Sequence, residues 1–194
     1  QTRPANPWSV IGIASLAAFM VFLDTQVLFV AFDDIRASFP SVSFAAMSWT
    51  LSAYTIALAA ALVPSGRLAD RFGRRRTFLI GLVAFTLASA LCALAPSAPL
   101  LVAFRVVQAL GAAALVPASL ALVLSVFPAE RVPVAVAIWG AIAALAAAVG
   151  PTAGALLVDG WSWRAVFLVN LPVGALALWL GLRYVPESRE SARL

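Results

Sequence analysis

The sequence predicts an all-α membrane protein, a bundle of six transmembrane helices, and three observations lead to that prediction. Of its 194 residues, 63% are hydrophobic and only 11% are charged, whereas a soluble domain is roughly 45–50% apolar and about 25% charged. The mean hydropathy is +1.02. Six runs of the chain are long enough to cross a bilayer, which takes about 20 mostly apolar residues per helix. The bilayer is therefore the expected solvent for this chain.

The six expected spans follow one another with short breaks between them. They cover residues 8–32, 44–65, 75–95, 99–126, 132–157 and 163–184. Turn residues and charges form the breaks, among them Asp33–Arg36, Pro96–Pro99 and Pro128–Arg131. The first run is too long for a cleavable signal peptide and carries Asp24 inside it. Since no linker or low-complexity segment interrupts the chain, residues 1–194 are expected to form one helical domain.

The arginines predict how the bundle is oriented. All 13 basic residues are arginine, and 10 of them fall on one side of the six spans. These are Arg3, Arg67, Arg71, Arg74, Arg75, Arg76, Arg131, Arg183, Arg189 and Arg193. Cytoplasmic loops carry such an excess, so we expect both termini in the cytoplasm and the protein in the cell (inner) membrane. A membrane divides these arginines among separate loops, which argues against a nucleic-acid partner.

The residue types present restrict the chemistry. The sequence has no histidine and a single cysteine, Cys92. This removes His-activated nucleophiles, His-ligated metals, disulfides and Cys clusters. There is also no Gly-x-Ser-x-Gly run. We therefore expect neither an enzyme nor a bound metal or cofactor.

Two ionisable residues lie inside the expected spans, Asp24 in the first and Arg105 in the fourth. Burying such a charge costs on the order of 2.5–3.5 kcal/mol, which makes each a candidate functional residue. A helical rise of about 1.5 Å per residue places both at similar depths in the outer half of the bilayer. A nearby guanidinium favours the ionised carboxylate, and burial favours the neutral acid. Asp24 is thus a candidate for proton uptake and release; the alternative is a static ion pair that only fixes helix packing.

Other candidate residues follow along the chain. Gln108 lies one turn after Arg105 and faces either substrate or another helix. Gly66 and Gly73 permit a tight reversal between the second and third spans. Asp70, between them, can accept hydrogen bonds from helix-end amides or from two arginines, Arg71 and Arg74.

The fifth and sixth spans carry further patterns. Small residues recur every four positions in the fifth span, at 140, 144 and 148 and again at 146, 150 and 154, and let helices approach closely. Pro151 is expected to bend this helix. The stretch that opens the sixth span carries Trp161, Trp163, Arg164 and Asn170 near the outer interface, and we interpret it as structural.

Five ordered segments of the sequence resemble motifs of the major facilitator superfamily. Residues 66–76 resemble its signature loop, 105–117 its arginine motif, and Gly150-Pro151-Thr152-Ala153-Gly154 its antiporter motif. Residues 23–25 and 163–172, with Trp49 and Tyr54, are similar to the branch of 14-span drug:proton antiporters. The sequence departs from that branch at three positions in and directly after the first span, which carry Gln26, Phe29 and Asp33.

The resemblance implies a secondary active transporter, with this chain as its N-terminal six-helix half. The implied activity is proton-coupled efflux, by antiport, of hydrophobic or cationic drug-like compounds. Asp24 would carry the coupling proton and Arg105 would tune it. The implied cavity residues are Gln26, Tyr54 and Gln108. The implied cytoplasmic latch is the loop motif, Gly66, Asp70, Arg71, Gly73 and Arg74. The implied exporter signature, which seals the cavity against protons, is Gly150, Pro151 and Gly154.

The expected partners are a small-molecule substrate, protons, the lipid bilayer and a second six-helix bundle. Transporters of this kind bind substrate between two repeats, so one bundle supplies only one wall of the cavity. The chain begins with Gln1 and not with Met, and we expect the second bundle to lie outside it. Two alternatives remain: a half-transporter of another small solute that forms a homodimer, and a passive pore, which would need a polar lining.

Overall fold

The computed structural model describes residues 6–186 and consists of helices and their connections. The helices are α1 (Pro7–Ser38), α2 (Phe44–Phe72), α3 (Arg74–Ala93), α4 (Ala98–Val126), the 3₁₀ helix η1 (Ala129–Arg131), α5 (Val132–Gly160), α6 (Ala165–Leu168) and α7 (Asn170–Tyr184). Six segments are long and apolar enough to cross a membrane, with α6 and α7 together forming the last. This confirms the predicted all-α fold with six spans and makes the chain a multi-pass membrane protein.

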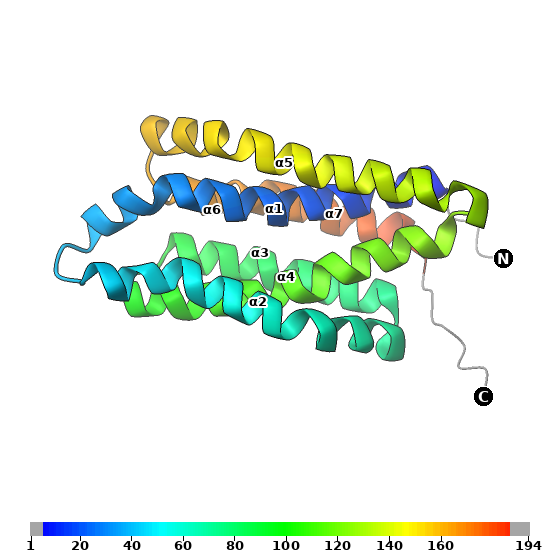
Figure 1. Cartoon of the computed structure of the whole chain (residues 1–194), viewed down its shortest axis with the longest axis horizontal. Helices are drawn as coiled ribbons and strands as arrows, with labels where there is room; N and C mark the ends of the chain where they lie inside the picture. The colour runs from blue at the N-terminus through cyan, green and yellow to red at the C-terminus, as the bar shows by residue number, and fades with distance from the viewer. Residues whose placement is uncertain (1–5, 187–194) are drawn as a thin grey trace.

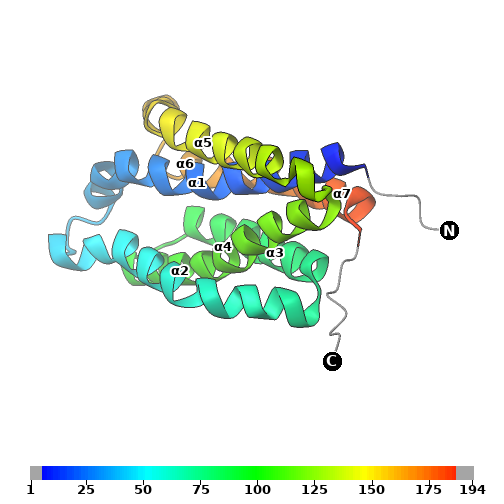
Figure 2. The same ribbon diagram turned by 45° about the vertical axis from the view of Figure 1, so that its right-hand side comes forward.

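The helices form two layers. In Figure 1, α1, α5, α6 and α7 lie above α2, α3 and α4, and the turned view in Figure 2 keeps this division. Each of the first three spans packs on one of the last three spans. α1 packs on α5, α2 packs on α4, and α3 packs on α7. This is the arrangement expected of two three-helix repeats. It brings α1 and α4, which carry the two intramembrane charges, into direct contact.

Helix ends differ from the predicted breaks in two places. The segment Asp33–Arg36 is not a break but the last turns of α1, which continues to Ser38. Here the Ser38 hydroxyl donates to the Asp34 carbonyl at 3.0 Å, and the exposed charges are solvated at the helix end. The sixth span is interrupted at Val169, between α6 and α7. Pro172 explains the interruption, because it has no amide hydrogen and its ring crowds the carbonyl four residues earlier.

The predicted reversal between the second and third spans uses one glycine and not two. Gly66 lies inside α2, so its expected place in the turn is wrong. Glycine inside a helix costs only about 1 kcal/mol relative to alanine, which is too little by itself to end the helix at Gly66. Gly73 makes the turn alone, with φ of 106°, a conformation that side chains other than glycine rarely adopt. Consequently Asp70 and Arg71 are helical residues in the last turns of α2.

Two glycines set the distance between α3 and α4. A Cβ placed on Gly81 would lie 2.8 Å from the backbone nitrogen of Leu115. A Cβ placed on Gly111 would lie 2.6 Å from the backbone nitrogen of Phe85. The two backbones therefore touch where these residues meet, and only a missing side chain allows the contact.

The two ends of the bundle carry different charge. The end at which α1 begins and α7 finishes holds most of the described arginines (Figure 1). They are Arg67, Arg71, Arg74, Arg75, Arg76, Arg131 and Arg183. Arg36 and Arg164 lie at the opposite end. The remaining arginines of the expected cytoplasmic set, Arg3, Arg189 and Arg193, lie outside the described residues.

Candidate functional site

The two intramembrane charges form a buried ion pair. Nη1 of Arg105 donates to Oδ2 of Asp24 at 2.6 Å, and each side chain is only 1% exposed. The same Nη1 donates to Oε1 of Gln108 at 2.7 Å. The guanidinium carbon lies 3.9 Å from the centre of the Tyr54 ring, a favourable cation–π geometry. Side chains that are far apart in the sequence thus meet in one contact between α1, α2 and α4.

The second oxygen of Asp24 accepts two more hydrogen bonds. Nε2 of Gln108 and Nδ2 of Asn170 each donate to Oδ1 at 2.9 Å. Both oxygens of this carboxylate therefore face donors, and one of the donors is positively charged. Such a surrounding compensates the cost of burying a carboxylate.

Ser89 of α3 connects this pair to α7. Its hydroxyl accepts from Gln108 Nε2 at 3.1 Å and from Asn170 Nδ2 at 2.9 Å. It donates to the carbonyl of Phe167 at 3.0 Å, close to the interruption between α6 and α7. We call Asp24, Ser89, Arg105, Gln108 and Asn170 the polar network. It joins α1, α3, α4 and α7.

The polar network separates two apolar clusters. On α1, one cluster extends from Val10 to Val21 and the other from Leu23 to Ile35. The same change of cluster occurs on α3 between Phe85 and Cys92, on either side of Ser89. The network is thus a thin polar layer with packed hydrocarbon above and below it. Because unpaired polar groups are costly in such surroundings, its members hold one another in place.

Two members of this network are not predicted by the sequence. Asn170 belongs to the stretch interpreted as structural and near the outer interface, yet it is buried and bonds to Asp24. Ser89 is not among the candidate residues, although it is completely buried. The available signal is the lone amide of Asn170 a few residues inside an apolar run. The sequence predicts that the sixth span begins at residue 163, and this start places the Asn170 amide near the membrane surface instead of inside the bundle.

The predicted cavity residues are closed to solvent or packed on a neighbouring helix. Tyr54 and Gln108 are 1% and 0% exposed. Gln26 is half-buried and its side chain lies against Gly150 of α5. The Tyr54 hydroxyl makes no hydrogen bond within the described residues. A role in substrate binding for these three remains a prediction.

The antiporter motif packs within this bundle. A Cβ on Gly150 would collide with the Gln26 side chain, and one on Gly154 would lie 3.1 Å from the Cα of Val27. These glycines and Ala146 thus form the contact between α5 and α1. The other stripe, at 140, 144 and 148, is uncovered, since a Cβ added to Gly140 would meet no atom within 4 Å. Pro151 is exposed.

The loop motif lies at the arginine-rich end, distant in sequence from the polar network. Asp70 is 57% exposed and lies 3.7 Å from Arg74, one turn away across Gly73. Arg71 covers the ring of Phe72 at 5.4 Å. The Asp70–Arg74 pair is partly exposed, since Arg74 is 19% exposed, and a pair at the surface contributes about 0–1 kcal/mol. Among the described residues no group of three His, Cys, Asp or Glu side chains could hold a metal ion.

We expect Asn170→Leu to weaken the fold measurably. It removes one hydrogen bond to Asp24 and one to Ser89, and two interhelical hydrogen bonds of this kind together contribute about 1–2 kcal/mol. The free energy of unfolding in detergent, measured by denaturant titration, should fall by about that amount. The matched control is Thr55→Val on α2, an exposed residue whose hydroxyl bonds to the Leu51 carbonyl of its own helix. Equal stability of the two variants would contradict the structural role of Asn170.

Comparisons with known proteins agree on one family. The model of the Major Facilitator Superfamily matches residues 14–193. Multidrug resistance protein Stp of Mycobacterium tuberculosis is 48% identical over 180 residues, which are 92% of this chain and 33% of that protein. The tetracenomycin C resistance and export protein of Streptomyces glaucescens is 37% identical over 184 residues, 95% of this chain and 34% of that protein. The chain thus spans about a third of the length of these relatives.

A solved structure supports the fold. The proton:xylose symporter XylE, bound to 6-bromo-6-deoxy-D-glucose, matches with a TM-score of 0.81. The alignment covers 94% of this chain and 45% of the symporter, at 18% sequence identity. At that identity the likeness concerns the arrangement of helices alone.

Proposed function

This chain belongs to the major facilitator superfamily, and from that premise we propose that it is the N-terminal half of a transporter that exports hydrophobic or cationic drug-like compounds in exchange for protons. Two observations support the export activity. Relatives that are 48% and 37% identical are named for multidrug resistance and for export of tetracenomycin C. The proposed site of proton coupling is the polar network.

The observation that carries the proposal is the burial of Asp24 against Arg105. Asp24 is buried, whereas the other described acids, Asp33, Asp34, Asp70, Glu130 and Asp159, are all exposed. A charged residue inside the membrane is costly and marks a functional site. Asp24 is therefore the carboxyl of the described chain best suited to carry a proton across a hydrophobic interior.

Proton uptake would rearrange the contact between α1 and α4. A neutral Asp24 no longer balances the guanidinium, so the 2.6 Å pair loses its main attraction. Arg105 keeps its other contacts, to Gln108 and to the Tyr54 ring, and so stays with α4 and α2. The two bonds that Asp24 Oδ1 accepts from Gln108 and Asn170 remain, so α1 is held less tightly to α4 and can shift relative to it. α5 moves with α1 because Gly150 and Gly154 pack on it. Proton release restores the pair.

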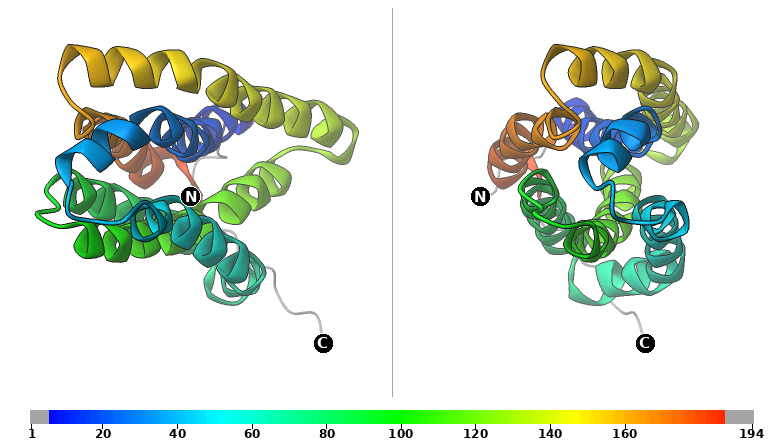
Figure 3. Two further views of the ribbon diagram at one scale, coloured as in Figure 1. Left: turned by 60° about the vertical axis from the view of Figure 1, so that its left-hand side comes forward. Right: turned by 90° about the vertical axis from the view of Figure 1, so that its left-hand side faces the viewer.

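A second bundle completes the transport path in this proposal. The most apolar stretches of α2 and α5 are the least buried of the six spans. Seen from one end in Figure 3, α5, α1 and α2 follow one another along one side of the bundle, and α7 lies on the other. We assign the side of α2 and α5 to the second bundle. We assign the protein to the inner membrane of the cell and its arginine-rich end to the cytoplasmic side.

The proposal is tested by transport in vesicles. The transporter that contains this bundle is reconstituted with a pH gradient, and movement of a fluorescent hydrophobic cation is recorded. Export should follow the proton gradient and stop when an ionophore removes it. Export of equal rate without the gradient would overturn proton coupling. Cross-linking and native mass measurement distinguish one long chain from a homodimer.

Arg105→Ala should strongly reduce this transport. The change leaves a buried carboxylate without its counter-charge, which costs about 3–5 kcal/mol when one partner of a buried pair is removed. The measurement is the initial export rate per folded molecule in the same vesicles. Arg183→Ala is the control, because Arg183 lies in the last turn of α7 and stacks on Trp179 instead. Normal export and normal pH dependence in Arg105→Ala would leave Arg105 with no role in coupling.

A further inference from the structure

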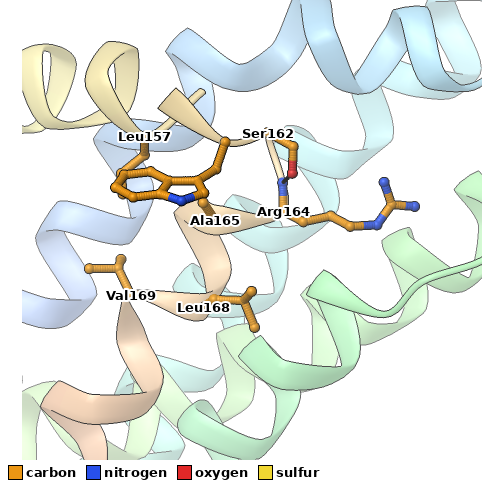
Figure 4. Close-up of a pocket in the computed structure, with 7 residues that line it drawn as sticks. Leu157, Ser162, Arg164, Ala165, Leu168 and Val169 are labelled. Carbon is orange, nitrogen blue, oxygen red and sulfur yellow. Dashed lines mark hydrogen bonds between the residues drawn. The ribbon is translucent and has the colours of Figure 1, made fainter. Parts of the chain in front are cut away.

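A pocket opens at the end of the bundle opposite to the arginine-rich end. Its volume is about 650 Å³, and it lies where α5 finishes and α6 begins (Figure 4). It is lined by Leu157, Trp161, Ser162, Arg164, Ala165, Leu168 and Val169. None of these residues belongs to the polar network, so the proposed transport mechanism does not use this pocket.

The lining changes from apolar to polar toward the end of the bundle. Leu157 lies one turn before the end of α5, and Leu168 and Val169 lie a turn beyond the start of α6. These apolar side chains therefore lie one helical turn, about 5 Å, deeper along the helix axes than the connection between α5 and α6. Trp161, Ser162 and Arg164 lie in the connection between the helices, which is the end of the bundle itself. A hydrophobic floor with an indole and a cation at its rim matches the change from hydrocarbon to headgroup region in a bilayer.

Arg164 is available to a ligand. It is exposed, and its guanidinium lies over the Trp163 ring at 4.3 Å. Its side chain extends away from Leu157 and Val169, so it does not fill the apolar part of the pocket (Figure 4). Asp159 is the nearest acid in the sequence, and no ion pair joins it to Arg164 within residues 6–186. The indole of Trp161 is 79% exposed.

We propose that this pocket binds a membrane phospholipid. The Arg164 guanidinium binds the phosphate, to which its planar set of donors is suited, and an acyl chain lies on the apolar floor formed with Leu157, Leu168 and Val169. The occupant is a lipid because the pocket lies at the end of transmembrane helices and its polarity follows that of a bilayer leaflet. Charge complementarity between the rim and a phosphate selects phospholipid over neutral lipid.

The test measures lipid binding to the whole chain, freed of lipid in detergent, by native mass spectrometry. The probes are phosphatidylglycerol and a diacylglycerol with the same two acyl chains and no phosphate. Arg164→Gln should weaken phosphatidylglycerol binding about tenfold, the loss of a charge-assisted hydrogen bond, and leave diacylglycerol binding unchanged. Ala165→Phe should weaken binding of both lipids, because its ring occupies the acyl-chain position.

Arg36→Gln is the matched control for charge. Arg36 is exposed at the same end of the bundle and lies over the Phe44 ring at 5.8 Å, but it does not line this pocket. The Arg36→Gln protein should bind phosphatidylglycerol as tightly as the unaltered protein does. An equal loss in Arg36→Gln and Arg164→Gln would show diffuse attraction by surface charge and overturn the proposal. Unaltered binding in Arg164→Gln would overturn it as well, and since Arg164 is exposed, this variant is expected to fold.

Discussion

Replacing Asp24 by asparagine should abolish proton-driven export while the protein still inserts into the membrane. The substitution keeps the size of the side chain but removes the charge that balances Arg105 at 2.6 Å. An amide also cannot accept on both sides. If its oxygen accepts from Gln108 and Asn170, its NH₂ faces the guanidinium, and two donors then oppose each other. The variant therefore loses both the titrating group and the geometry of the polar network.

The measurement is export of a hydrophobic cation against an imposed pH gradient, normalised to the amount of inserted transporter. Asp34→Asn is the matched control, because Asp34 lies on the same helix but is exposed at its end. We expect the control to export at the normal rate. Full export by Asp24→Asn, with the gradient still required, would assign the coupling proton to another group.

The second large effect concerns folding and not transport. Gly111→Leu should prevent α3 and α4 from packing, because even its Cβ would lie 2.6 Å from the Phe85 backbone nitrogen. Ordinary overpacking costs about 1–3 kcal/mol and is relieved by moving side chains. Here the obstructing atoms are backbone atoms, so the helices themselves must separate. The expected cost is at the upper end of that range or above it.

The fraction of folded, monodisperse protein after detergent extraction measures this effect. Gly140→Leu is the control, since a Cβ at Gly140 meets no atom within 4 Å. Both variants add the same side chain to a glycine inside a transmembrane helix, so they differ only in the space available. A Gly111→Leu protein that extracts and unfolds like Gly140→Leu would show that α3 and α4 are not held at this distance.

The fold could be predicted because its signals are local. Each span is a run of apolar residues, and a bilayer admits such runs only as helices. The family resemblance rests on motifs that are continuous in the sequence, such as residues 150–154, and the comparisons confirm it. The prediction that both Gly66 and Gly73 form the turn is wrong for Gly66, because a turn depends on the backbone conformation and not on residue type alone. Composition marks both Gly66 and Gly73 as possible turn residues, but only a backbone conformation shows which of them turns.

The polar network could be predicted only in part. Asp24 and Arg105 can be recognised from the sequence alone, because each is a charged residue within an apolar run. Asn170 and Ser89 are not, because uncharged polar residues are common at helix ends and contacts. Their significance depends on which helices face each other. The packing of the first three spans on the last three cannot be inferred from the sequence of any single segment.

By itself, the sequence determined that this chain crosses a membrane six times, which family it belongs to, and which two charges are buried. The spans and the buried charges follow from the cost of placing polar groups in hydrocarbon, a cost that acts on each residue separately. The family follows from motifs that are continuous in the sequence. Only the tertiary structure decided that Asp24 is held by three donors from α4 and α7, and that Gly150 and Gly154 of α5 pack on α1. Contacts between distant segments depend on packing, and packing is a property of the assembled helices.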